Sequence, residues 1–176
     1  MIVVDTNIVM YLLLTGEHTE SARSVFQRDP LWAAPLLWRS ELRNVLSRYV
    51  RQGHLPLTDA LVMQRAAEEL FAGHEYPVDS SQVLEAAYTS GCVAYDCEFV
   101  TLARLLNVPL VTSDKQILAA FPGLAVGPQA FGTVGGSTSG SGATAAAVHE
   151  PSEREQRDVP SAHQYSRTAA PRNKFD

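Results

Sequence analysis

Three aspartates of this 176-residue chain stand at positions where an ionised carboxylate is costly. Asp5 follows the apolar run 1–4, and Asp114 follows the short apolar segment 109–112, so both come at the ends of segments typical of buried strands. Asp96 lies in the apolar stripe of a predicted helix, because apolar residues follow it three, four and seven positions later. A buried, unpartnered carboxylate is strongly unfavourable. Each therefore needs a cation, a network of donors or a raised pKa.

Each acidic side chain also has an ordinary explanation when it is taken alone. Asp5 and Asp114 both open predicted helices, where a carboxylate commonly caps the free amides and is favoured by the helix dipole. Glu41 lies beside the apolar stripe of its own predicted helix, and a solvated position at the edge of that stripe explains it equally well. Asp96, in the middle of its stripe, is the hardest to explain in this way.

The four acids converge when the segments that carry them are placed around a parallel sheet. Asp5 and Asp114 follow strands, while Glu41 and Asp96 begin helices that would pack over the same end of the sheet. Four acids there would repel one another and raise their pKa values unless a cation were present. Oxygen ligands without Cys or His select Mg²⁺ or Mn²⁺ rather than zinc. One or two such ions bind a phosphodiester and lower the pKa of an attacking water.

The elements that must position these acids alternate between short apolar strands and amphipathic helices, which indicates an α/β domain with a parallel sheet. The predicted strands cover residues 1–5, 31–34, 74–78, 109–112 and 124–126. The predicted helices cover residues 7–14, 19–28, 35–52, 58–71, 79–91, 94–106 and 113–121. Pro35 suits the first turn of the third helix. Asp79 with Gln82, and Ser113 with Gln116, have the spacing of capping boxes.

The composition divides the chain into a domain over residues 1–131 and a tail over residues 132–176. The net charge of −5 lies entirely in the domain, which is therefore poorly suited to binding a nucleic acid duplex through a broad basic surface. The tail is rich in Gly, Ser, Thr, Ala and Pro, and we predict that it is disordered. No apolar run reaches the roughly 18 residues of a membrane span. We expect a cytoplasmic protein with no signal peptide and no membrane contact.

The sequence resembles the PIN domain family over residues 1–130, and within it the VapC ribonuclease toxins of prokaryotic toxin–antitoxin systems. The resemblance rests on VVDTNIV at the N-terminus, WRSELRNVL around Glu41 and AYDCEFVTLARLLNVPLVTSDKQIL around Asp96 and Asp114. It implies a three-layer α/β/α sandwich with a mainly parallel central sheet of four to five strands. It also implies a Mg²⁺- or Mn²⁺-dependent endoribonuclease that acts on RNA, forms a homodimer and is neutralised by a cognate antitoxin. Such toxins generally end near the last strand, so the resemblance assigns no role to the tail.

The family's acidic set maps residue by residue onto this chain. Its members are Asp5, Glu41, Asp96 and Asp114. The three aspartates are expected to ligate the metal, and the glutamate is expected to ligate it or to hold a water bound to it. The polar side chains expected to orient these carboxylates are Thr6, Asn7, Thr112 and Ser113. The candidates for contacts with RNA phosphates are Arg48 and Lys115.

Three other interpretations are compatible with parts of the pattern. A haloacid-dehalogenase-type phosphatase also places an Asp after its first strand, but it usually needs a second Asp two residues later, and that position is Asn7 here. A non-catalytic binding module would keep the fold for its partners, although the intact acids argue against it. An RNA-processing nuclease without a toxin role keeps the same chemistry. A small antitoxin-like reading frame immediately upstream would separate a toxin from such an enzyme.

Overall fold

A computed structural model of the chain describes residues 1–133. Its five strands are β1 (Ile2–Val4), β2 (Trp32–Pro35), β3 (Glu75–Tyr76), β4 (Leu110–Val111) and β5 (Ala125–Val126). They form one sheet in the order β3-β2-β1-β4-β5, and every neighbouring pair is parallel. The prediction of a parallel sheet is confirmed. Strands β1, β2 and β4 are fully buried, which explains why they are short continuous apolar runs.

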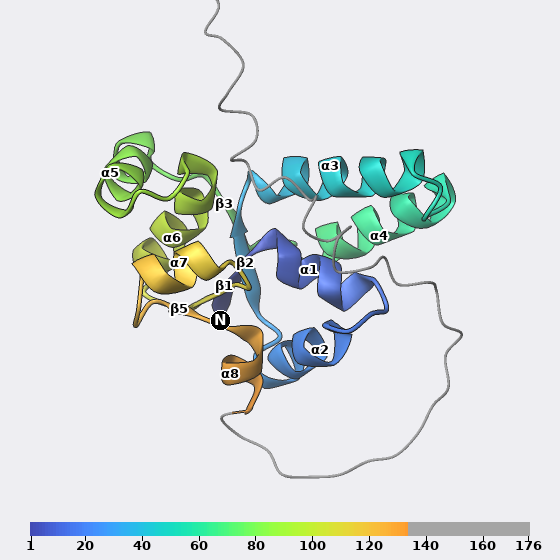
Figure 1. Cartoon of the computed structure of the whole chain (residues 1–176), viewed down its shortest axis with the longest axis horizontal. Helices are drawn as coiled ribbons and strands as arrows, with labels where there is room; N and C mark the ends of the chain where they lie inside the picture. Colours follow the sequence, from blue (N-terminus) through green and yellow to red (C-terminus); the bar gives the residue numbers. More distant parts are fainter. Residues whose placement is uncertain (134–176) are drawn as a thin grey trace, which may run out of the picture.

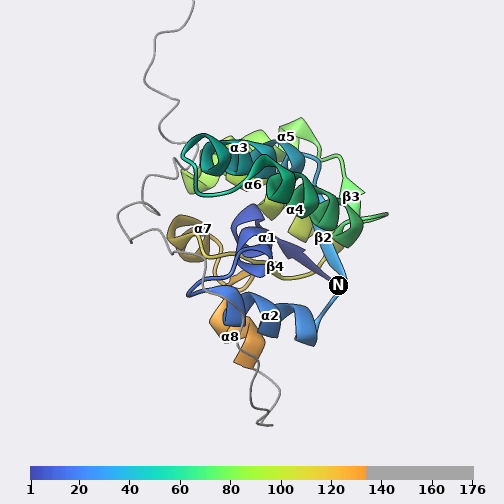
Figure 2. The ribbon, with the colours of Figure 1, turned by 90° about the vertical axis from the view of Figure 1, so that its right-hand side faces the viewer.

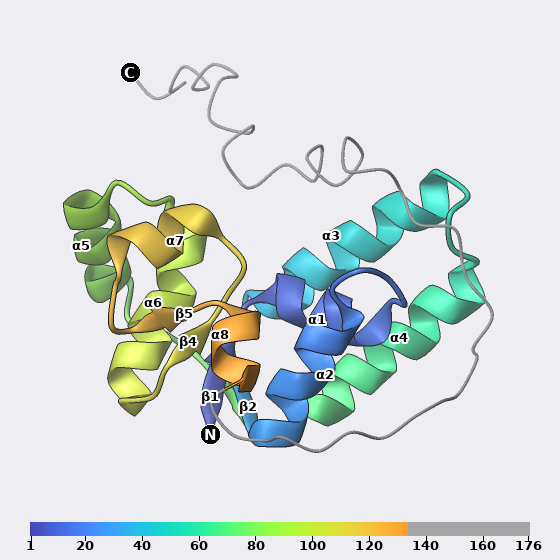
Figure 3. The same ribbon diagram turned by 60° about the horizontal axis from the view of Figure 1, so that its bottom comes forward.

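Eight helices surround this sheet within the described residues. They are α1 (Thr6–Leu13), α2 (Thr19–Arg28), α3 (Trp38–Arg51), α4 (Leu57–Leu70), α5 (Ser80–Ser90), α6 (Ala94–Leu106), α7 (Lys115–Ala120) and α8 (Pro128–Thr133). Figures 1 and 3 show α5, α6 and α7 on one side of the sheet and α1 to α4 on the other. Helices α3 and α4 lie side by side (Figure 2). The expected three-layer α/β/α sandwich is therefore present.

The core lies at the sheet, between the two helical layers. Its largest fully buried side chains are Trp32, Trp38, Phe71 and Phe99. The rings of Trp38 and Phe71 are 4.7 Å apart, which packs the start of α3 against the end of α4. None of the helices in residues 1–133 is long and apolar enough to cross a membrane.

Two predictions about helix starts are wrong. Ser113 does not cap α7; Asp114 is the N-cap, and its Oδ1 accepts hydrogen bonds from the amides of Gln116 at 2.7 Å and Ile117 at 3.0 Å. The carboxylate, one residue closer to the helix, reaches the free amides directly. Pro35 does not begin the third helix either, because it is the last residue of β2 and pairs with Tyr76 of β3. The predicted cap at Asp79 is confirmed by its 3.0 Å hydrogen bond from the amide of Gln82.

Helix α8 is an element that the sequence pattern does not predict. It packs against α2 (Figure 3), where Arg28 donates a hydrogen bond to the carbonyl of Phe131 and places its guanidinium 4.4 Å from the centroid of that ring. A Cβ atom at Gly132 would lie 2.8 Å from Cβ of Ser24, so glycine permits this close approach. The predicted domain boundary at residue 131 falls inside α8. Residues 134–176, which make up nearly all of the predicted disordered tail, lie outside the described residues.

Candidate active site

The four acids come from four different elements, and each lies at the start of a helix. Asp5 joins β1 to α1, and Asp114 caps α7 just after β4. Glu41 and Asp96 lie in the first turns of α3 and α6. The positive end of a helix dipole favours a carboxylate at such positions. Strands β1 and β4 are parallel neighbours, so their carboxyl ends open at the same edge of the sheet.

Thr112 connects the two aspartates that follow the central strands. Its hydroxyl donates a 2.7 Å hydrogen bond to Oδ2 of Asp5 and accepts a 3.0 Å hydrogen bond from the amide of Asp114. The threonine is fully buried, and Asp5 is only 8% exposed. Asp5 occupies the N-cap position of α1 but makes no capping hydrogen bond through its side chain. Its carboxylate is therefore held by the Thr112 hydroxyl at the end of β4, and the backbone amides of Asn7 and Thr6 at the start of α1 also act on it.

Thr6 makes the equivalent contact to Glu41. The Thr6 hydroxyl donates a 2.6 Å hydrogen bond to Oε2 of Glu41, across 35 residues of sequence. Thr6 is itself buried at the first turn of α1. This contact ties the start of α1 to the start of α3 and fixes the direction of the Glu41 side chain.

The pKa values of three of the acids are raised. Burial raises the pKa of Asp5, and the charge of Asp114 raises it further. The hydrogen bond from Thr112 and the backbone amides of Asn7 and Thr6 partly offset this rise. Burial and the charge of Asp5 raise the pKa of Glu41 to about 8, against a lowering by Thr6. Burial and the charges of Asp5 and Asp114 raise the pKa of Asp96 to about 7. The carboxylates therefore lie close enough to repel one another.

This donor set fits a hard divalent cation in its chemistry. The charged groups with the largest effects on the pKa values of Glu41 and Asp96 are all acids. The ion pairs between side chains of residues 1–133 use the carboxylates of Glu20, Glu68 and Glu75, and Asp29 pairs with the N-terminus. Within the same residues, no three His, Cys, Asp or Glu side chains have the arrangement of a complete metal site.

The structure places the remaining predicted residues at different distances from the acids. Asn7 is half-buried, and its backbone amide acts on the pKa of Asp5. The Ser113 hydroxyl lies 3.3 Å from the hydroxyl of Tyr11. Arg48 is half-buried on α3, two turns beyond Glu41, and Lys115 is exposed at the first position of α7.

Two residues near the acids were missed by sequence reasoning. Glu98 is two positions from Asp96, a spacing that points the two side chains to different faces of the helix, yet its charge raises the pKa of Glu41. Burial raises the pKa of Glu98 itself. Tyr11 reaches Ser113 from α1. No sequence signal identifies either residue, because both lie near the acids through contacts between segments distant in the chain.

The chain has a parallel sheet between two helical layers, and its acids gather beyond the ends of the central strands. This arrangement defines a class of α/β proteins with an acidic site at the point where the strand order reverses. The chain belongs to the PIN domain family, whose model matches residues 2–123. This finding confirms the resemblance inferred from the sequence.

Similar proteins agree with this assignment. Ribonuclease VapC3 of Pyrobaculum aerophilum is 30% identical over 127 residues, which are 70% of this chain and 96% of that protein. The crystal structure of PAE2754 from the same organism matches with a TM-score of 0.60 and 20% identity, over 74% of this chain and 85% of that one. A chain from a toxin–antitoxin complex of Klebsiella pneumoniae matches with a TM-score of 0.53 and 16% identity, over 73% of this chain and 98% of that one. These structures share the fold.

Proposed function

We propose that this chain is a Mg²⁺- or Mn²⁺-dependent endoribonuclease, acting as the toxin of a toxin–antitoxin pair in the cytoplasm. Membership of the PIN domain family and 30% identity to a ribonuclease support the nuclease activity. The observation that carries the proposal is the convergence of Asp5, Glu41, Asp96 and Asp114 from four elements, where burial and then mutual repulsion raise the pKa values of Glu41 and Asp96. A divalent cation would relieve that repulsion.

In this proposal the aspartates would hold the ion, and Glu41 would ligate it or hold a water beside it. The ion would bind the phosphodiester and lower the pKa of the attacking water. The chain's own part is positioning: Thr112 and Thr6 each donate a hydrogen bond that fixes one carboxylate, Asp5 and Glu41 respectively. We assign phosphate contacts to Arg48 and Lys115, and an orienting role to Asn7 and Ser113.

Cleavage of RNA by purified variants tests this proposal. Loss of an outer-shell partner of a metal ligand typically costs about 10–100-fold, so Asp5→Asn and Asp96→Asn, which change proposed ligands, should lose more than about 100-fold in activity. EDTA should abolish cleavage, and added Mg²⁺ or Mn²⁺ should restore it. Glu85→Gln, which removes an exposed carboxylate from α5, is the matched control and should remain fully active. Full activity of either aspartate variant, or of the parent protein in EDTA, would overturn the proposal.

The toxin role, the cognate antitoxin and the homodimer are separate parts of the proposal. The similarity in fold to a chain from a toxin–antitoxin complex supports the first two. Exposed apolar side chains on α5, Leu84 at 64% and Tyr88 at 91%, support the third.

Induction of the gene should arrest growth, and co-expression of a small upstream reading frame should relieve the arrest. An active nuclease whose induction leaves growth unchanged would be an RNA-processing enzyme instead. Sedimentation of the purified chain would test the dimer.

A further inference from the structure

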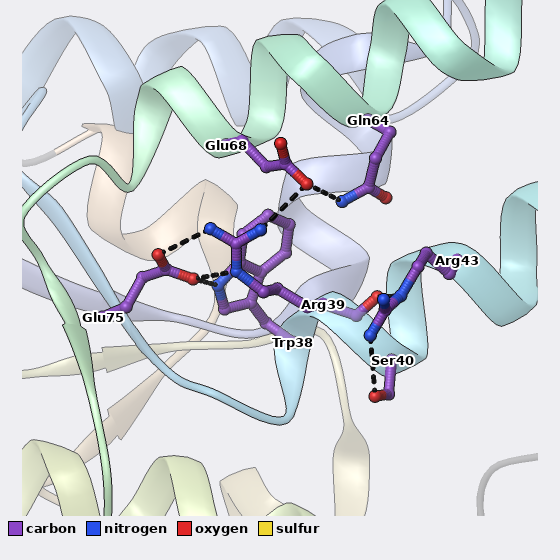
Figure 4. A network of polar contacts seen from close by, with 7 residues as sticks. All are labelled: Trp38, Arg39, Ser40, Arg43, Gln64, Glu68 and Glu75. Atoms are coloured by element: carbon purple, nitrogen blue, oxygen red, sulfur yellow. Dashed lines mark hydrogen bonds and ion pairs between the residues drawn. The ribbon is translucent and has the colours of Figure 1, made fainter.

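Glu75, the first residue of edge strand β3, accepts three hydrogen bonds from the start of α3 (Figure 4). Its Oε1 atom receives the indole N–H of Trp38 at 2.7 Å and Nε of Arg39 at 2.6 Å. Its Oε2 atom receives Nη2 of Arg39 at 2.8 Å. The contact with Arg39 is therefore bidentate, which is the strongest and most directional form of this ion pair.

The strand that carries Glu75 is positioned by the strand that leads into α3. Residues Ala34 and Pro35 of β2 pair with the two residues of β3, and the amide of Leu36 donates to the carbonyl of Tyr76 at 3.1 Å. The chain then passes through Leu37 into α3. Glu75 thus reaches from the sheet edge across this turn to the first two residues of the helix.

The start of α3 also packs through Trp38 on Phe71 and receives the Thr6 hydrogen bond at Glu41, but its own capping is weak. Its N-cap residue, Leu37, provides no side-chain capping bond. The amides of Ser40 and Glu41 bond to the Leu37 carbonyl at 2.9 Å and 3.2 Å, which closes the first turn. Glu41 lies in that same turn, two residues after Arg39 and three after Trp38. Whatever fixes the turn in space also fixes the Cα position of Glu41.

We infer that Glu75 is a positioning residue for Glu41: by holding Trp38 and Arg39 it places the first turn of α3 so that the Glu41 carboxylate meets Thr6 and the other acids. The placement of the turn follows from the contacts above, and its consequence for metal binding rests on the proposed function. Glu75 does not touch the acids, so it acts only through the helix.

Glu68 provides an internal comparison. It also pairs with Arg39, at 2.9 Å, but it lies on α4 and contacts no other residue of the α3 first turn in the network of Figure 4. Its side chain is 39% exposed, against 18% for Glu75. Exposed ion pairs contribute little to the stability of a fold. Both glutamates therefore neutralise Arg39, but of the two only Glu75 connects the turn to the sheet.

Amide hydrogen exchange of the metal-free protein tests the placement itself. Glu75→Gln keeps the size of the side chain, but its amide presents one acceptor oxygen instead of two, so the bidentate contact is lost. We expect the amides of Ser40 and Glu41 to exchange about tenfold faster in this variant and less than about twofold faster in Glu68→Gln. Unchanged exchange in Glu75→Gln overturns the inference. Arg39→Lys, which keeps the charge and loses the two-point contact, is measured in the same way if Glu75→Gln does not fold.

Calorimetric titration with Mn²⁺ tests the consequence for the site. Glu75→Gln should weaken Mn²⁺ binding about tenfold, and it should have no further effect in a Glu41→Gln background because its effect passes through Glu41. Equal weakening in both backgrounds overturns the inference. A parent protein that binds no Mn²⁺ refutes the proposed function, and the exchange measurement then still decides whether Glu75 positions the turn.

Discussion

Replacement of Glu41 by Gln should make the metal-free protein more stable at neutral pH. The pKa of Glu41 is raised from 4.5 to about 8, first by burial and then by the charge of Asp5. Between these two values the folded state holds a proton that the unfolded state has released. Stability therefore falls as the pH rises through this window, and it is highest at its acidic end. Glutamine removes the ionisation but keeps an oxygen that can accept the hydrogen bond from Thr6.

The size of the effect follows from the two pKa values. Each rise of one pH unit between them lowers the free energy of unfolding by about 1.4 kcal/mol. The loss of stability relative to a neutral side chain is therefore about 0.8 kcal/mol at pH 5 and about 3.4 kcal/mol at pH 7. Glu41→Gln should therefore flatten the pH dependence of the free energy of unfolding by about 2–3 kcal/mol over this range. Asp96, with its pKa raised to about 7, should leave a residual slope of the same sign.

Urea unfolding in EDTA at pH 5, 6 and 7 measures this difference. The free energies of unfolding of the parent protein and Glu41→Gln should differ by only about 0.8 kcal/mol at pH 5 and diverge as the pH rises. Glu85→Gln, with an exposed carboxylate, should follow the parent at each pH. Parallel curves for the parent and Glu41→Gln would show that Glu41 is ionised without cost in the folded protein. The reasoning about repulsion among the acids would then be refuted.

Three further changes have defined outcomes. Thr112→Val removes the hydrogen bond to Asp5 and should lower RNA cleavage by about 10–100-fold in a steady-state assay; normal activity would mean that Asp5 needs no support. Thr101→Val replaces a buried hydroxyl that has no hydrogen-bond partner among the described residues, and urea unfolding should show a gain of about 1 kcal/mol, with cleavage unchanged. Mn²⁺ at about 100 times its dissociation constant should stabilise the parent by about 2.7 kcal/mol in thermal unfolding, and no shift would exclude specific binding.

Residues that lie at the ends of strands could be predicted from the sequence. Asp5 and Asp114 follow continuous apolar runs, and such runs predict buried parallel strands whose ends meet at one edge. Asp96 could be found because Phe99 and Val100, which define its apolar stripe, are both buried. In these cases a local pattern was enough to fix the environment of the side chain.

Contacts between distant segments could not be predicted in this way. The hydrogen bond from Thr6 to Glu41 and the contact of Glu75 with Arg39 depend on how α1 and β3 meet α3. The charge of Glu98 reaches Glu41 for the same reason, although helical spacing places it away from Asp96. Periodicity gives the face of a helix, but it does not give the neighbour that covers that face.

The sheet ends in a strand of only two residues at each edge, β3 on one side and β5 on the other. An open edge is where a sheet can add strands from another molecule and grow into an aggregate. Here each edge offers too little free backbone to template such growth, and the Glu75 side chain at one of them is committed to Arg39. Within residues 1–133 the two short edge strands therefore disfavour strand-by-strand association.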